Sequence, residues 1–150
     1  NMKTLILYNS KKGFTLKCAE YLHNEIKDSD LFSIDSKEFN FEDYEKVLIG
    51  APIYFGGVNK DVVKFLNKNR VILLKKKLGM FYSGMNKEDI SKTVQESLPA
   101  DLFYHAEIVH SGGAYYFEKM NFLQRMIVKK VANVYKTTED FKIEKLKSLI

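Results

Sequence analysis

The chain has 150 residues, of which 45% are hydrophobic and 29% charged, and its formal net charge is +5. This composition favours a single globular domain over residues 1–150 and excludes a disordered or repetitive chain. The apolar runs are too short for a membrane-spanning helix, and the single cysteine excludes an internal disulfide and fits a reducing cytoplasm. Asn1 before Met2 suggests the remnant of an expression tag.

Strand and helix patterns alternate through the first part of the chain. Residues 3–8 form a short apolar run that is typical of a buried strand, and two further strands are expected at 31–34 and 46–51. Between the first two strands, apolar residues at helical spacing predict a helix from Thr15 to about Asp28. The hydroxyl of Thr15 suits the N-terminal cap of that helix.

A loop and a helix are expected after the third strand. Pro52 favours an extended conformation for Ala51, and Gly56 and Gly57 then allow the chain to double back. Asn59 is a suitable cap for the helix that follows. The buried stripe of this helix is expected to contain the apolar residues Val62, Val63, Phe65 and Leu66.

The same alternation continues to the end of the sequence. Strands are predicted at 78–83 and 103–110, separated by a polar helix over about 87–97. After the glycine pair at 112 and 113, a long helix is expected over about 117–135, and a last helix over about 140–149. Alternating elements of this kind predict an α/β fold with a parallel sheet.

Five strands favour a doubly wound parallel sheet in the order 2-1-3-4-5, with helices on both faces. In that order a ligand lies beyond the carboxyl ends of the strands, at the switch point between strands 1 and 3. The loops at 9–15 and 51–58 follow these two strands. The topology therefore predicts that the two loops lie together.

Three segments resemble the flavodoxin family: "YNSKKGFT" after the first strand, "VLIGAPIYFGG" at the third and "FYSGMN" at the fourth. The first matches the family's Ser/Thr-x-x-Gly-x-Thr loop, which holds the 5′-phosphate of flavin mononucleotide (FMN). Backbone N–H groups and the positive end of a helix dipole give such a loop its affinity for phosphate. The resemblance implies a flavodoxin-like fold that binds FMN.

The resemblance also implies which residues contact the cofactor. The phosphate loop comprises Ser10, Lys11, Lys12, Gly13, Phe14 and Thr15. Two further loops would wall the flavin ring and meet its polar edge: Pro52, Ile53, Tyr54, Phe55 and Gly56, and Ser83, Gly84, Met85 and Asn86. Gly112 and Gly113 are expected at the rim of the same site. An alternative for Tyr54 and Phe55 is a purely structural role as hydrophobic plugs of their loop.

Within the fold, "GMFYSGMN" and "HSGGAYYFEKMNFLQRMIVKKVA" resemble the branch that contains menaquinone-dependent protoporphyrinogen oxidase. The second segment includes a basic amphipathic helix over 117–135 that short flavodoxins lack. Two interpretations of this helix are open: it packs on the domain with a solvated basic face, or it meets an anionic membrane surface. The C-terminal stretch "VYKTTEDFKIEKLKSLI" is shorter than in that branch and lacks tryptophan.

Three functions follow as hypotheses. The first is a protoporphyrinogen oxidase-like, FMN-dependent oxidoreductase that passes electrons to a quinone, in the cytoplasm or at the inner face of the membrane. The second is a flavodoxin-type electron shuttle that works with a reductase protein, and the third is a binding module without FMN. No catalytic acid or base, metal site or nucleic-acid partner is expected. Cys18 is expected in the core, and His110 either hydrogen-bonds near the flavin or has a structural role.

Overall fold

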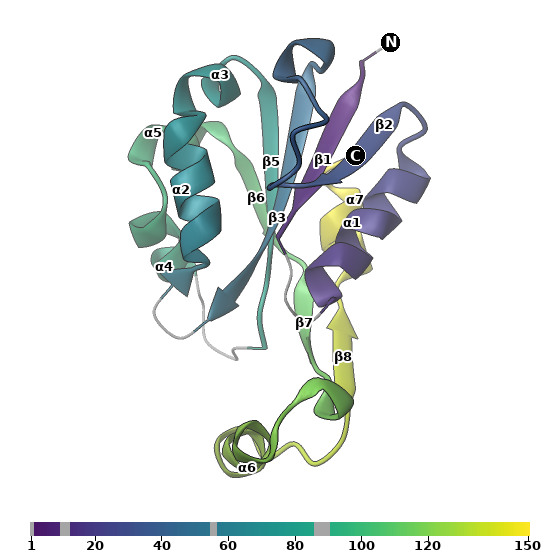
Figure 1. Cartoon of the computed structure of the whole chain (residues 1–150), viewed down its shortest axis with the longest axis vertical. Coiled ribbons are helices and arrows are strands. Elements are labelled where there is room, and N and C mark those ends of the chain that lie inside the picture. The colour runs from purple at the N-terminus through teal and green to yellow at the C-terminus, as the bar shows by residue number, and fades with distance from the viewer. Residues whose placement is uncertain (1, 10–12, 55–56, 86–90) are drawn as a thin grey trace.

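A computed structural model describes residues 2–9, 13–54, 57–85 and 91–150. Five parallel strands form the central sheet in the order β2-β1-β3-β5-β6 (Figure 1). Their bounds are Thr4–Tyr8 (β1), Ser29–Ser33 (β2), Lys46–Tyr54 (β3), Lys77–Ser83 (β5) and Glu107–His110 (β6). Gly57–Val58 (β4) folds back antiparallel on the end of β3, as the glycine pair predicts. The doubly wound order is confirmed, because the fourth and fifth predicted strands are β5 and β6.

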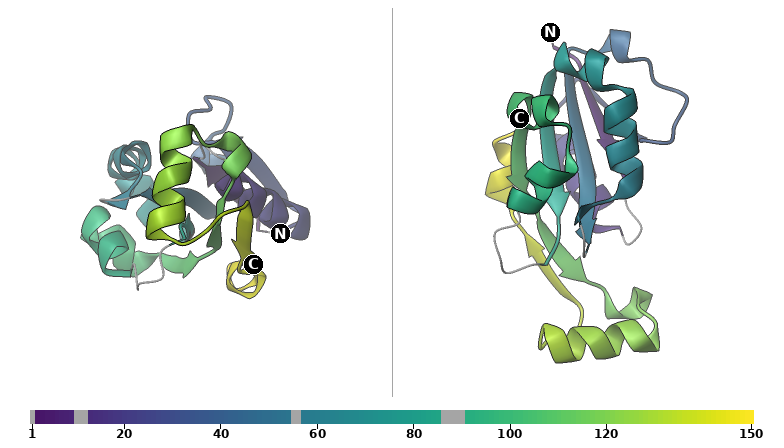
Figure 2. Two further views of the ribbon diagram at one scale, coloured as in Figure 1. Left: turned by 90° about the horizontal axis from the view of Figure 1, so that it is seen from below. Right: turned by 90° about the vertical axis from the view of Figure 1, so that its left-hand side faces the viewer.

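Helices cover both faces of this sheet (Figures 1 and 2). On one face lie Phe14–Glu25 (α1) and Ile143–Lys147 (α7), and on the other lie Lys60–Lys68 (α2), Arg70–Leu74 (α3), Ser91–Ser97 (α4) and Ala100–His105 (α5). A short 3-10 helix, Phe41–Asp43, precedes β3. In β1, Leu5 and Leu7 enter the core on the α2 side, whereas Ile6 enters the core on the α1 side. Burial on both faces explains why the strands are continuous apolar runs.

One glycine in the sheet leaves room for the largest fully buried side chain. Gly50 in β3 pairs with Phe81 in β5, and the Phe81 ring is completely buried. A Cβ built on Gly50 would lie 2.2 Å from Phe81 Cε2. The sheet therefore needs a residue without a side chain at position 50.

We expect Gly50→Ala to lower the free energy of unfolding by about 1–3 kcal/mol, because the added methyl forces the Phe81 ring out of its position. Urea unfolding checks this. The double variant Gly50→Ala/Phe81→Leu is expected to recover part of the loss, since leucine leaves space for the new methyl group. Equal stability of Gly50→Ala and the wild type would contradict the packing.

Residues 112–141 form an arm that projects from the carboxyl edge of the sheet. Gly112–Tyr115 (β7) and Thr138–Phe141 (β8) pair antiparallel as a two-stranded stalk. The stalk carries the 3-10 helix Phe117–Lys119 (η2) and the helix Phe122–Val131 (α6), which lies across its far end (Figures 1 and 2). The single helix predicted over 117–135 is therefore wrong in its bounds.

Local signals set the bounds of α6. The Asn121 side chain accepts a hydrogen bond from the N–H of Gln124, whose side chain accepts one from the N–H of Asn121, so the two residues form a capping box. At the other end, Asn133 adopts φ 56°, a left-handed conformation that asparagine tolerates and that stops the helix. The arm thus presents a short, well-capped helix.

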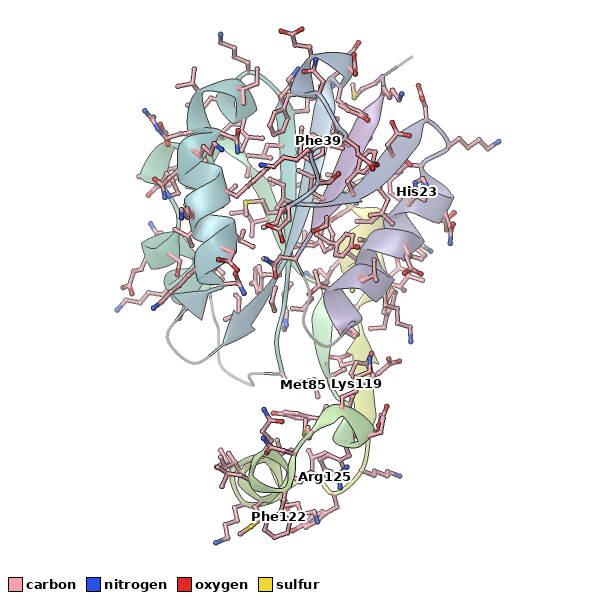
Figure 3. All side chains as sticks on the ribbon, viewed as in Figure 1. His23, Phe39, Met85, Lys119, Phe122 and Arg125 are labelled. Atoms are coloured by element: carbon pink, nitrogen blue, oxygen red, sulfur yellow. The ribbon has the colours of Figure 1, made fainter. Side chains whose placement is uncertain are left out.

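The apolar side chains of α6 do not pack on the domain. Phe122 is 78% exposed, Leu123 64% and Val131 73%. Figure 3 shows Phe122 at the far end of the molecule, whereas Arg125 lies on the side of the stalk, where its Nε donates to the carbonyl of Phe117. The expectation of a buried apolar arc with a solvated basic face is therefore corrected.

Other element predictions need smaller corrections. Residues 103–105 of the predicted strand 103–110 belong to the end of α5, and the strand begins at Glu107. The predicted helix 140–149 is the end of β8 followed by the shorter α7. The polar helix begins at Ser91 among the described residues. Asn59 caps α2 as predicted, because its side chain accepts hydrogen bonds from the N–H groups of Asp61 and Val62.

Candidate functional site

The N-terminus of α1 lies at the carboxyl end of β1. Gly13 is the N-cap residue, with φ 92°, and the first turn of α1 contains no acidic side chain. The partial positive charge of this helix end is therefore not offset by an acidic residue within the turn. Ser10, Lys11 and Lys12 lie outside the described residues. The described half of the predicted phosphate loop is compatible with an anion at this helix end.

Thr15 joins this helix end to the sheet. It is not the N-cap, so that prediction is wrong, and only 2% of it is exposed. Its hydroxyl donates to Ser83 Oγ at 3.3 Å, and Ser83 Oγ lies 3.0 Å from Ser111 Oγ. The Ser111 hydroxyl in turn donates to the Tyr82 carbonyl at 2.9 Å. This buried chain of hydroxyl groups fixes α1 against the carboxyl ends of β5 and β6.

Phe14 is also turned inward. Its side chain is 6% exposed and meets Phe141 edge to face, with the ring centres 6.0 Å apart. The side chains of Phe14 and Thr15 are both engaged in the protein. These two residues can therefore contact a ligand only through their backbone N–H groups at the start of α1.

Three of the predicted loops touch one another at the same edge of the sheet. The N–H of Gly84 donates to the Gly112 carbonyl at 2.8 Å. A Cβ on Gly113 would lie 2.6 Å from the Gly84 carbonyl carbon and 2.9 Å from Met85 Cγ, so the two loops are in direct backbone contact. A Cβ on Gly84 would lie 3.5 Å from the Ile53 carbonyl oxygen. The end of β3 therefore lies beside the loop that contains Gly84.

The remaining predicted site residues fall into two groups. Pro52 lies inside β3, in register with Ser83 of β5, and Tyr54 is the last residue of β3. The predictions for Phe55, Gly56 and Asn86 fall outside the described residues. The structure thus gathers the described members of all four predicted segments at the carboxyl edge of the sheet, and their contacts with a cofactor remain a prediction.

His110 supports one of these loops. Its Nε2 lies 2.9 Å from the Gly84 carbonyl oxygen, and its ring stacks on Tyr82 with the centres 5.2 Å apart and the planes 7° apart. With Nε2 donating to the carbonyl, His110 holds the loop at 83–85 against the end of β6. This geometry favours the structural role that the sequence left open.

Cys18 is a core residue, as predicted. Its side chain is completely buried in α1, where burial raises the pKa of the thiol to about 12 despite a hydrogen bond with Ser111. A thiol with so high a pKa is not reactive near neutral pH. Cys18 therefore contributes packing rather than redox chemistry.

The stalk of the arm is fastened to α1 through Glu139. Its carboxylate accepts hydrogen bonds from Lys17 Nζ at 2.7 and 2.9 Å, and from the Tyr116 hydroxyl. These hydrogen bonds, that from Lys17 above all, lower the pKa of Glu139. The ion pair is partly exposed, so we expect it to contribute only about 0.2–1 kcal/mol.

Acid is therefore expected to loosen the stalk. A carboxylate whose pKa is lowered by folding contributes stability above its unfolded pKa, and this contribution is lost as the pH falls through the folded pKa. We predict that the protection factors of the β7 and β8 amides fall a few-fold over this acidic range. In the Glu139→Gln variant, the protection factors of these amides should not fall over this pH range. The same acidic step in both proteins would contradict the role of Glu139.

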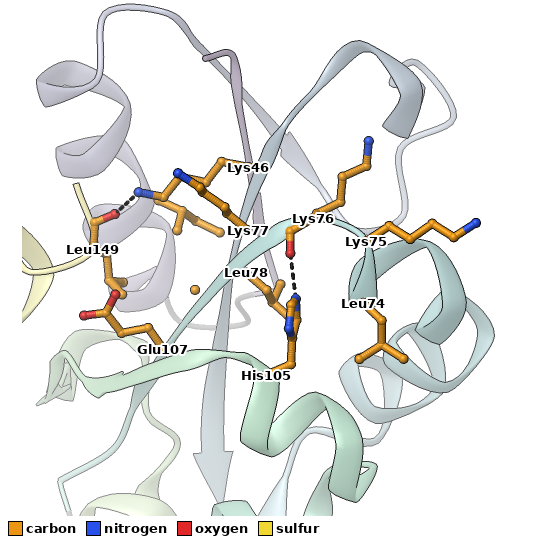
Figure 4. Close-up of a pocket in the computed structure, with 11 residues that line it drawn as sticks. Lys46, Leu74, Lys75, Lys76, Lys77, Leu78, His105, Glu107 and Leu149 are labelled. Carbon is orange, nitrogen blue, oxygen red and sulfur yellow. Dashed lines mark hydrogen bonds between the residues drawn. The ribbon is translucent and has the colours of Figure 1, made fainter.

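A separate cavity of about 480 Å³ lies at the opposite, amino-terminal edge of the sheet (Figure 4). The first residues of three strands line it: Lys46, Lys77 and Glu107. Lys46 Nζ donates to the Leu149 carbonyl, and the His105 ring bonds the carbonyl of Lys76. These polar groups are engaged with the backbone. The cavity also lies at the wrong end of the strands for a ligand at the switch point.

Sequence reasoning missed two residues near the predicted site. Ser111 links β5 and β6, and only its place directly after the fifth predicted strand could have indicated it. Lys119 falls within the basic helix predicted over 117–135, yet its Nζ would lie 3.0 Å from a Cβ on Gly13. No local pattern could place it there, since the contact joins residues far apart in the sequence.

The chain belongs to the flavodoxin domain family, which it matches over residues 5–142. It is 34% identical over 73 residues to the quinone-type protoporphyrinogen IX dehydrogenase of Escherichia coli strain K12. That match covers 45% of this chain and 40% of the E. coli protein, so this chain spans less than half the length of that relative. It is also 28% identical over 93 residues to a flavodoxin of Clostridium saccharobutylicum, covering 57% of each chain.

Solved structures share the fold. A flavoprotein from Lactobacillus acidophilus NCFM in complex with FMN has a TM-score of 0.56 at 20% identity and covers 75% of this chain and 93% of its own. A Fusobacterium nucleatum flavodoxin bound to FMN has a TM-score of 0.57 at 16% identity and covers 81% of this chain and 75% of its own. These likenesses confirm the predicted flavodoxin-like architecture.

Two kinds of site are absent from the described residues. None of the helices in the described ranges is long and apolar enough to span a membrane. Within those same ranges, no group of three or more His, Cys, Asp or Glu side chains is arranged to hold a metal ion.

Proposed function

We propose that this protein is an FMN-dependent oxidoreductase that works at a membrane surface and passes electrons to a quinone, in the manner of a protoporphyrinogen dehydrogenase. Membership of the flavodoxin domain family supports FMN as the cofactor. Two of the solved structures that share the fold are complexes with FMN. The 34% identity to the E. coli protoporphyrinogen dehydrogenase supports the reaction class.

The described residues fit FMN at the carboxyl edge of the sheet. The start of α1 has no side-chain cap and no acidic residue in its first turn, which suits a phosphate dianion. The left-handed Gly13 keeps the adjoining backbone free of a side chain. The contact between Gly84 and Gly113 supports a rigid wall for the flavin ring beside Ile53. When bound, FMN supplies the electron-transfer chemistry, and the protein supplies binding, orientation and electrostatics.

The residues of the chain therefore act by positioning. The hydroxyl chain from Thr15 to Ser111 holds the start of α1 against β5, so a bound phosphate and flavin ring would be anchored to one rigid body. His110 holds the Gly84 carbonyl in place and thereby orients the loop that would meet the ring edge. No side chain of the described site needs to serve as a general acid or base in this scheme.

The arm carries the membrane part of the proposal. The outward arc of α6 contains five exposed apolar side chains: Phe122, Leu123, Met126, Ile127 and Val131. The helix also carries Arg125, Lys129 and Lys130 and no acidic residue. An exposed apolar arc with basic neighbours matches the pattern of a helix that lies in the headgroup region of an anionic bilayer. Quinones partition into the same bilayer, which would bring the electron acceptor close to the flavin site.

The observation that carries this proposal is the exposed apolar face of α6 on an arm rooted beside the flavin site. A soluble electron shuttle between proteins has no need of such a face. The shuttle remains the second candidate because of the 28% identity to a clostridial flavodoxin. A binding module without FMN is the third.

Turnover separates these candidates. The FMN-loaded protein is expected to oxidise protoporphyrinogen with a menaquinone analogue as acceptor, and to do so faster with anionic vesicles present. Absence of turnover together with rapid reduction by a flavodoxin reductase would support the shuttle. Absence of FMN binding would leave the binding module.

A further inference from the structure

Lys119 connects the arm to the predicted phosphate site. It is the last residue of η2, and Figure 3 shows it between the carboxyl edge of the sheet and the arm. Its Nζ would lie 3.0 Å from a Cβ built on Gly13, the N-cap residue of α1. The ammonium group of Lys119 is therefore at the helix end where the phosphate of FMN is proposed to bind.

Neighbouring residues fix this position. Lys119 Nζ lies 4.8 Å from the centre of the Tyr116 ring, at a cation–π distance. The Tyr116 hydroxyl donates to Glu139, which is paired with Lys17 of α1. Met120, directly after Lys119, is only 9% exposed and anchors the end of η2. The exposed side chain of Lys119 therefore lies over a tyrosine that is itself tied to α1 through Glu139.

The electrostatics of this place favour an anion. The N-terminus of a helix carries a partial positive charge, and a lysine ammonium beside it adds a full positive charge. No acidic residue occurs in the first turn of α1. A phosphate dianion at this position would interact favourably with both the helix end and the ammonium group.

We propose that Lys119 is a phosphate-binding residue of the cofactor site, contributed by the arm. The inference rests on the proposed binding of FMN. It makes the arm part of the flavin site as well as a surface element, since the residue that contacts the phosphate lies three positions before α6. It also predicts that the protein distinguishes FMN from riboflavin more strongly than the backbone of the loop alone would allow.

The test compares two flavins that differ only in the phosphate. For Lys119→Gln, titration followed by flavin fluorescence is expected to give a Kd for FMN about tenfold higher than for the wild type, the loss typical of one charge-assisted hydrogen bond. The Kd for riboflavin should stay within twofold. The FMN affinity of the variant should also depend less on salt, because one cation fewer faces the phosphate.

Two further variants serve as controls. Lys129→Gln removes a lysine of α6 and should bind both flavins like the wild type. Lys119→Arg keeps the charge and should recover most of the FMN affinity. Unchanged FMN affinity in Lys119→Gln, or an equal loss for FMN and riboflavin, would overturn the role of Lys119 while leaving FMN binding by the wild type intact. A wild type that does not bind FMN would overturn this inference and the proposed function together.

Discussion

Replacing Gly113 with alanine is expected to weaken FMN binding at least tenfold and to lower the free energy of unfolding by about 1–3 kcal/mol. The added methyl group would lie 2.6 Å from the carbonyl carbon and 2.7 Å from the carbonyl oxygen of Gly84. Both atoms belong to the backbone, so the clash is relieved only by separating the two loops. The wall proposed for the flavin ring would open as a result.

Thermal unfolding and FMN fluorescence titration measure the two effects. Gly84→Ala is the matched control for stability, because its new Cβ would meet the Ile53 carbonyl oxygen at an ordinary 3.5 Å. That variant should stay within about 0.5 kcal/mol of the wild type. If Gly113→Ala retained both wild-type stability and wild-type FMN affinity, the proposed meeting of the loops would be wrong.

The double variant Phe122→Glu/Leu123→Glu is expected to reduce binding to anionic vesicles at least tenfold. Each exposed apolar side chain contributes about 1.5–3 kcal/mol when it is buried, and each new carboxylate is repelled by anionic lipid. Phe122 and Leu123 occupy the first turn of α6, where acidic residues stabilise a helix, so the fold of the arm should persist. Sedimentation with phosphatidylglycerol vesicles provides the measurement.

Val71 offers a matched control for this experiment. It is 62% exposed, about as much as Leu123, but it lies in α3 at the opposite end of the molecule from α6 (Figure 1). Val71→Glu should therefore bind vesicles like the wild type. A wild type that does not sediment with anionic vesicles, or a double variant that sediments equally well, would refute a membrane role for the arm.

The sequence was sufficient for the sheet because each buried strand is a local signal. The runs at 3–8, 46–51 and 78–83 are apolar on both faces, and their order along the chain implies the switch point. The loops that follow these strands had to lie together once the topology was correct. For this reason the predicted gathering of Ile53, Ser83 and Gly84 did not require any long-range information.

The predictions that proved wrong have a common physical cause. In each case long-range contacts override a local sequence pattern. Thr15 has the chemistry of a helix cap, but its hydroxyl bonds Ser83, which is 68 positions away. The helical spacing of apolar residues in α6 is the usual sign of burial, yet the stalk carries this face away from the domain. Residues 103–105 look like part of a strand, but the preceding Pro99 starts a helical turn in which Leu102 is buried.

Titration of the purified protein with FMN tests the proposed cofactor site most directly. We expect one FMN to bind per chain with a Kd at or below about 1 µM, to give a yellow protein with quenched flavin fluorescence, and to bind more tightly than riboflavin. This result would support a site that binds both the flavin ring and its phosphate, as proposed for the carboxyl edge of the sheet. A colourless protein that leaves the fluorescence of added FMN unchanged would contradict it.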